Sequence, residues 1–222
     1  MKMGSIVALG GVVVFLVFAI WAVSKVFGNY SPKKGKIKKD LQKIKTDLEP
    51  LVADLVPIEK GEMELLSLNQ IKNKSRKGVT KTGKGVFTSI YNEPMVAYAY
   101  KKYVASGTNA LIYARTANNE FIYRIKNSEV EIVIDDHLAG IMKDDGKFYG
   151  AKSQKLLAEV NQSTEELALP VIVREKNVGS IVNPAKARKS QARAFEYVGN
   201  LEKDEETLFL SLAVLELVQR SE

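Results

Sequence analysis

The sequence has no cysteine and a single histidine, His137. A chain without cysteine has no disulfide and fits a domain that stays in the cytoplasm. It also lacks the thiolate ligands of most structural zinc sites, and one histidine is too few for the typical alternatives. Neither a cysteine nor a G-x-S-x-G serine offers a nucleophile. We therefore expect a non-enzymatic protein without a cofactor and without catalytic residues.

Charge is absent from the twenty residues Ser5 to Ser24. At about 1.5 Å of rise per residue, a helix of this length covers the roughly 30 Å of a bilayer's hydrocarbon core. The run is longer than the roughly 7 to 15 apolar residues of a secretory signal. A cleaved signal stays an alternative, because Ala22-Val23-Ser24 has the small-x-small form of a cleavage site. We expect an uncleaved transmembrane anchor over residues 1–30.

Acidic residues are also scarce after the uncharged run, where eight lysines and only Asp40 occur in residues 25–45. Lysine-rich flanks stay on the cytoplasmic side of a membrane. This predicts a single-pass protein of the cell membrane, such as a bacterial inner membrane, with the N-terminus outside and the bulk of the chain in the cytoplasm. Basic charge next to a membrane helix is better explained by anionic lipid headgroups than by nucleic acid.

Residues 31–60 are predicted to form a basic amphipathic juxtamembrane helix. Apolar side chains recur there every three or four residues, at Ile37, Leu41, Ile44, Leu48, Leu51 or Val52, and Leu55. Pro50 is expected to kink or divide the helix near Glu49, and Pro57 to end its second piece. The apolar face has two readings: it lies on lipid or a partner's helix, or it packs on the protein's own domain.

From residue 61 the apolar period changes to two, which is typical of strands. In the segment Phe121 to Ile125, for example, alternate residues are apolar. The expected strands are Met63–Leu68, Gly85–Ile90, Met95–Val104, Ala110–Thr116, Glu120–Ile125, Glu129–Ile134, Leu138–Lys143, Lys147–Gly150, Lys155–Val160, Leu169–Glu175, Asn177–Val182 and Arg193–Val198.

The last segment, Leu208 to Val218, is apolar on nearly every side. Its eleven residues are too few to span a bilayer, so we expect a buried helix capped by Asp204. The fold class is therefore mainly β, with about twelve antiparallel strands in a barrel and a buried C-terminal helix, all in one domain over residues 61–222.

This order of elements resembles the tubby C-terminal-like superfamily, which includes the phospholipid scramblases and the LURP-one-related proteins. The likeness covers residues 61–222 and depends on His137-Leu-Ala-Gly140-Ile141, on Asn177-Val-Gly179-Ser-Ile181, and on the acidic run Glu202 to Glu206 before the last helix. The resemblance implies a twelve-stranded barrel around its own hydrophobic helix. Unlike the scramblases, this chain carries its membrane segment at the N-terminal end.

Two groups of basic residues are the predicted lipid-headgroup contacts. The first is in the juxtamembrane helix and the second follows Pro184, where the resemblance permits a headgroup site. A solvated basic loop is the simpler reading of the second group. The predicted contacts are Lys33, Lys34, Lys36, Lys38, Lys39, Lys43, Lys45, Lys186, Arg188, Lys189 and Arg193.

Three other patterns offer chemistry, each with a simpler explanation. Gly78 to Gly85 is close to a P-loop, but Gly85 replaces the magnesium-binding hydroxyl and a predicted strand follows where a helix is required. We expect a solvated, lysine-rich loop there. His137 beside Asp135 and Asp136 suggests a base, although a turn histidine is the commoner case. Glu202, Asp204, Glu205 and Glu206 occupy the place where the scramblases carry an acidic calcium-binding stretch, which makes them weak candidates for metal ligands. Helix capping explains the same acids, so no metal site is expected.

The sequence thus predicts a membrane-anchored, non-enzymatic scaffold that binds anionic phospholipid or a membrane-protein partner, with homo-oligomerisation as a further option. Movement of phospholipids, as in scramblases, is one alternative function, and a hydrolase that uses His137 is another.

Overall fold

The computed structural model describes residues 32–221, apart from residues 60, 79, 106, 163–164 and 189–192. The predicted membrane anchor, residues 1–30, lies outside the described residues. Among the helices that are described, none has the length and apolar character needed to cross a membrane.

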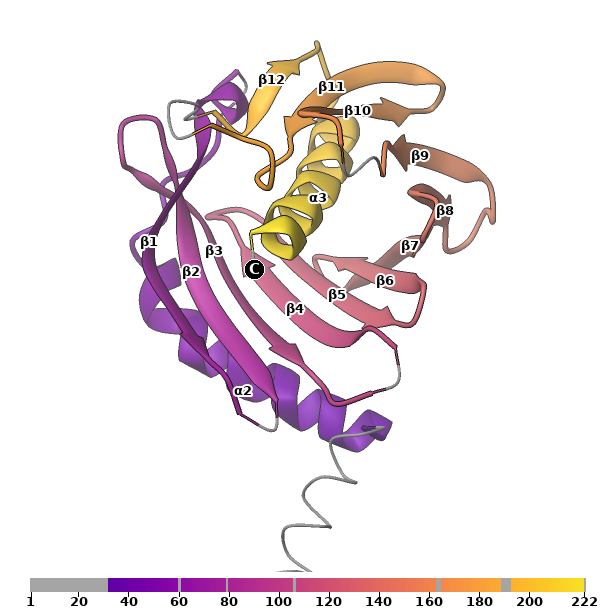
Figure 1. The fold of residues 1–222 in the computed structure, drawn as a ribbon. Coiled ribbons are helices and arrows are strands. Elements are labelled where there is room, and N and C mark those ends of the chain that lie inside the picture. The colour runs from indigo at the N-terminus through magenta and orange to yellow at the C-terminus, as the bar shows by residue number, and fades with distance from the viewer. Residues whose placement is uncertain are drawn as a thin grey trace, which may run out of the picture.

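Twelve strands form one antiparallel sheet in which each strand pairs with the next along the chain. The sheet curves into a nearly closed barrel around one helix, and a second helix lies outside it (Figure 1). The strands are β1 (Leu66–Arg76), β2 (Lys81–Ser89), β3 (Pro94–Lys102), β4 (Asn109–Arg115), β5 (Glu120–Lys126), β6 (Glu129–Ile134), β7 (His137–Lys143), β8 (Lys147–Gly150), β9 (Leu156–Val160), β10 (Ala168–Val173), β11 (Lys176–Val182) and β12 (Phe195–Val198).

The first and last strands approach each other at one point. Ser67 and Arg193 form an isolated antiparallel bridge, and the Ala194 backbone N–H donates to the Leu66 carbonyl at 2.8 Å. Beyond this point the outer edge of β1 is exposed from Ile71 onward. The mainly β, twelve-stranded architecture expected from the sequence is confirmed.

The first strand was predicted incorrectly. Met63–Leu65 forms a short 3-10 turn, η1, and β1 then continues to Arg76, eight residues past the expected end. β2 begins at Lys81, so the segment read as a solvated lysine-rich loop is a hairpin. All residues of β1 after Gln70 are exposed, which removes the alternation that identifies a half-buried strand.

The C-terminal helix α3 (Lys203–Arg220) passes through the interior of the barrel (Figure 1). Its residues from Phe209 to Val218 are all at most 4% exposed, which confirms the expected burial. The predicted cap was wrong: Glu202 is the N-cap, and it forms a reciprocal capping box with Glu205. On the barrel wall, Tyr123 donates its hydroxyl to the Ser211 carbonyl of α3 at 2.7 Å.

The outer helix α2 (Lys34–Val52) packs its apolar face against β3 and β4. Ile44 and Leu48 are buried there in a cluster with Leu111 and Tyr113. The apolar face of the predicted juxtamembrane helix therefore lies on the protein's own domain. Pro50 does not divide the helix as expected, because it lies in the last turn of α2. Residues 53–59 continue as a turn and irregular chain.

Candidate functional site

Polar contacts fix α2 on the barrel along both of its edges. Asp40 accepts hydrogen bonds from Lys101 Nζ at 2.7 Å and from the Tyr103 hydroxyl at 2.9 Å. On the other edge, Lys45 forms an ion pair with Glu120 of β5. The docked helix is therefore a fixed part of the domain surface.

Burial under α2 also changes the acidity of two tyrosines. Burial raises the pKa of Tyr113 to about 12, and Glu120 acts in the same direction while Arg115 opposes it. The pKa of Tyr103 is raised further, again by burial first and then by Asp40. Both hydroxyls therefore stay protonated at neutral pH and donate hydrogen bonds to the carboxylates beside them.

The docking directs most of the predicted lysines of α2 toward solvent. Lys33, Lys34, Lys38, Lys39 and Lys43 are exposed, whereas Lys36 and Lys45 are half-buried. Since Asp40 and Lys45 neutralise barrel residues, the exposed surface of the N-terminal half of α2 is almost purely cationic. This surface adjoins the part of the chain that leads to the uncharged run 5–24.

The second predicted basic group is less available. Lys186 pairs with Glu165 at 2.7 Å, and Arg193 lies 3.8 Å from Glu64. Arg188 is exposed, and Lys189 lies outside the described residues. These residues belong to the connection between β11 and β12, so they are not part of the surface formed by α2.

The structure adds to the candidate site a basic segment that the sequence interpretation did not include, the hairpin of β1 and β2. The hairpin carries six basic residues. No acidic residue occurs in the sequence between Glu64, which precedes the hairpin, and Glu93, which follows it. This long absence of acidic residues was the signal available in the sequence. Lys84 of β2 donates to the Asp47 carbonyl of α2 at 3.0 Å, and Lys72 of β1 pairs with Asp54 just after α2 at 3.0 Å. The hairpin therefore lies beside α2 (Figure 1).

The acidic run at the start of α3 stabilises local structure. Glu202 and Glu205 form the capping box, and Asp204 pairs with Arg174 at 2.6 Å. The hydrogen bond from Arg174 lowers the pKa of Asp204. In the described part of the chain, no group of three or more His, Cys, Asp and Glu side chains is arranged to hold a metal ion.

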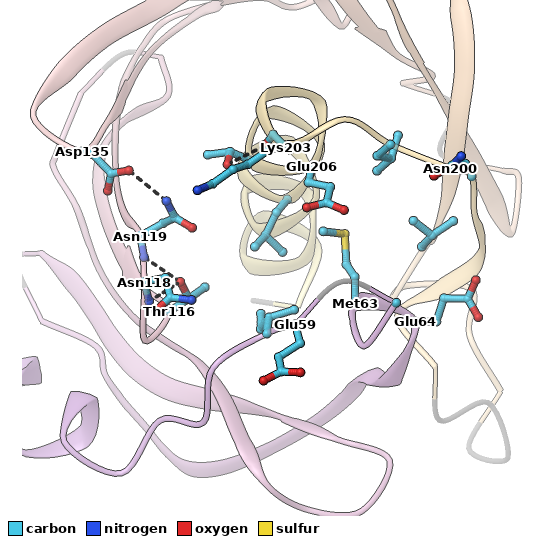
Figure 2. Close-up of a pocket in the computed structure, with 17 residues that line it drawn as sticks. Glu59, Met63, Glu64, Thr116, Asn118, Asn119, Asp135, Asn200, Lys203 and Glu206 are labelled. Carbon is cyan, nitrogen blue, oxygen red and sulfur yellow. Dashed lines mark hydrogen bonds between the residues drawn. The ribbon is translucent and has the colours of Figure 1, made fainter.

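A cavity of about 570 Å³ opens beside the N-terminal turns of α3. Figure 2 shows Lys203 and Glu206 of α3 pointing into it, with Asn119 and Asp135 on one wall and Met63 on another. Its carboxylates, from Glu59, Glu64, Asp135 and Glu206, outnumber its single cation, Lys203. An anionic headgroup is therefore disfavoured in this cavity.

His137 lies exposed at the start of β7. Its Nδ1 is 2.7 Å from the backbone oxygen of Asp135, whose carboxylate instead accepts hydrogen bonds from the Asn119 side chain and the Glu120 backbone. Asp135 and Asp136 have positive φ angles, as a tight hairpin turn requires. The aspartate carboxylate thus stabilises the turn and does not orient the imidazole.

The chain matches no protein-family model, no curated protein and no solved structure.

Proposed function

We propose that this protein is a single-pass membrane-anchored, non-enzymatic module that holds its barrel on the anionic cytoplasmic surface of the membrane through α2. The observation that carries the proposal is the orientation of α2. Its apolar face is used on the barrel, so its exposed lysines face outward as a fixed array. Each cation near an anionic leaflet contributes about 1 kcal/mol of binding free energy.

The position of the array favours lipid over a protein partner. Lys33, Lys34, Lys38 and Lys39 are in the first turns of α2, a short distance in sequence after the uncharged run 5–24. A transmembrane helix over residues 5–24 places these lysines at the depth of the lipid headgroups. Anionic headgroups attract lysines there without the shaped surface that a protein partner needs.

We also propose that the barrel is a distant relative of the tubby C-terminal-like superfamily. The support is architectural: twelve antiparallel strands in sequential order surround a buried C-terminal helix. The two glycine motifs have a physical role in this arrangement. A Cβ at Gly140 would meet the Tyr149 carbonyl at 2.1 Å, and one at Gly179 would meet the Phe209 ring of α3 at 2.7 Å.

Lysine footprinting of the full chain tests the membrane role. The protein is placed in lipid nanodiscs that are either neutral or about one-third anionic, and lysines are acetylated and read by mass spectrometry. We expect Lys38, Lys39 and Lys43 to be protected in anionic discs only, and the protection to weaken as salt shortens the Debye length from about 10 to about 3 Å. Lys152 and Lys155, exposed between β8 and β9, serve as internal controls. Equal modification of the α2 lysines in both kinds of disc would contradict the proposal.

A further inference from the structure

The register of the sheet places the tip of the β1–β2 hairpin next to the N-terminal half of α2. Arg76 of β1 pairs with Thr82 of β2, and Thr82 pairs with Lys101 of β3. Lys101 in turn binds Asp40 of α2. Because neighbouring strands are about 4.8 Å apart, Arg76 lies only about 10 Å across the sheet from the strand that anchors α2.

The register also assigns the hairpin cations to the outer face of the barrel. Lys84 and Val86 of β2 contact α2 and the apolar cluster beneath it, so their side chains point outward. Lys74 pairs directly with Lys84, and Arg76 stands two residues further along the same strand. Since directly paired residues and residues two apart share one face of a sheet, Lys74 and Arg76 point to the side that carries α2.

These cations face no acidic residue of their own hairpin, because none occurs between Glu64 and Glu93. Lys74, Arg76 and Lys77 are exposed, and Lys74 stands opposite another lysine. Like charges on paired positions are destabilising unless an external anion offsets them. The arrangement therefore fits an anionic partner surface.

We infer that Lys74, Arg76 and Lys77 form a second contact with anionic lipid headgroups, so that the side of the barrel that carries α2, and not an end of the barrel, faces the bilayer. This inference rests on the proposed function, since α2 supplies the first contact. Two contacts on one face fix the orientation of the barrel, whereas α2 alone leaves it free to tilt about the helix axis.

This orientation of the barrel also determines where the cavity beside α3 lies relative to the membrane. Successive turns of an antiparallel sheet alternate between its two ends, so the β1–β2 turn lies at one end and the β4–β5 and β6–β7 turns at the other. The cavity is lined by residues of these last two turns, including Asn119 and Asp135. Its acidic opening is thus at the end of the barrel away from the hairpin turn and does not face the headgroups.

Footprinting of the full chain in neutral and anionic nanodiscs also tests this inference. In the wild-type protein we expect Lys74 and Lys77 to be protected in anionic discs together with the α2 lysines. In anionic discs, the acetylation rate of Lys77 in the variant K74Q/R76Q should exceed that in the wild-type protein by about five-fold for each charge removed. The variant K152Q/K155Q has the same change in net charge at exposed positions and should behave like the wild-type protein.

The outcomes separate the two claims. If the α2 lysines are protected and Lys74 and Lys77 react equally in both discs, the inference is wrong and the proposed function stands. If the α2 lysines are unprotected as well, the proposed function fails. Protection of the hairpin in neutral discs, or loss of its protection in K152Q/K155Q, would also overturn the inference, because neither result comes from local charge.

Discussion

The carboxylate of Asp40 on α2 lies 2.7 Å from the ammonium nitrogen of Lys101 on β3, and both side chains are less than one-fifth exposed. Disruption of an ion pair at this depth costs more free energy than disruption of an exposed pair, because the remaining charged partner stays poorly solvated. Asp40 also accepts the Tyr103 hydroxyl. This pair therefore fixes the end of α2 that carries the exposed lysines.

Replacement of Asp40 by alanine should loosen α2 without unfolding the barrel. It removes the acceptor for Lys101 and Tyr103, at a cost of about 1–3 kcal/mol in docking free energy. Hydrogen exchange should accelerate in α2 and stay unchanged in β5 and β6, because local openings are independent of the core. Asp47→Ala is the matched control, since the Asp47 side chain is exposed and its backbone carbonyl is the acceptor for Lys84. Equal exchange in both variants would contradict this role of Asp40.

Gly179→Ala should destabilise the whole domain. The added methyl group would lie 2.7 Å from the ring of Phe209, which is fully buried on α3. Overpacking of a core typically costs about 1–3 kcal/mol. Thermal unfolding should therefore show a lower Tm. The same substitution at Gly35, an exposed position of α2 with open space around it, should leave Tm unchanged or raise it. A Gly179→Ala protein as stable as the wild type would show that Phe209 can move aside.

Much of the barrel could be predicted because its strands are half-buried. In β5, Phe121, Tyr123 and Ile125 are buried and alternate with less buried residues, as the sequence pattern indicates. Where one face of a strand does not contact the core, this signal disappears. The exposed part of β1 therefore could not be recognised, and the hairpin was assigned to a loop.

The candidate site was predictable only in part. The lysines of α2 and its amphipathic pattern are local features, so the sequence identified them. The position of the hairpin beside α2 depends on the pairing of Arg76 with Thr82 and of Thr82 with Lys101. Register between strands is set by contacts across the sheet, and the sequence alone does not state it.

Alkaline pH should weaken the docking of α2 through Tyr113. Its pKa is raised from 10.0 to about 12 in the folded protein, so folding favours the neutral phenol. The stabilisation is complete below pH 10 and is lost as the pH rises from 10 to about 12. Urea unfolding of the wild-type protein and of Tyr113→Phe at several pH values measures this contribution. The stability of the wild type relative to the variant should fall across that window, and a constant difference would contradict the prediction.

Glu216→Ala should be among the most destabilising substitutions in α3. Glu216 is 1% exposed and accepts hydrogen bonds from Arg220 Nε at 2.7 Å and from Gln162 Nε2 at 2.9 Å. Loss of one partner of a buried ion pair costs about 3–5 kcal/mol, and the side chains of this pair are only 2% (Glu216) and 14% (Arg220) exposed. Replacement of both partners by leucine removes both charges, so E216L/R220L should regain most of the loss. Urea unfolding compares the three proteins. If the double variant is as unstable as Glu216→Ala, the contact of Glu216 with Gln162, and not its ion pair with Arg220, dominates at this position.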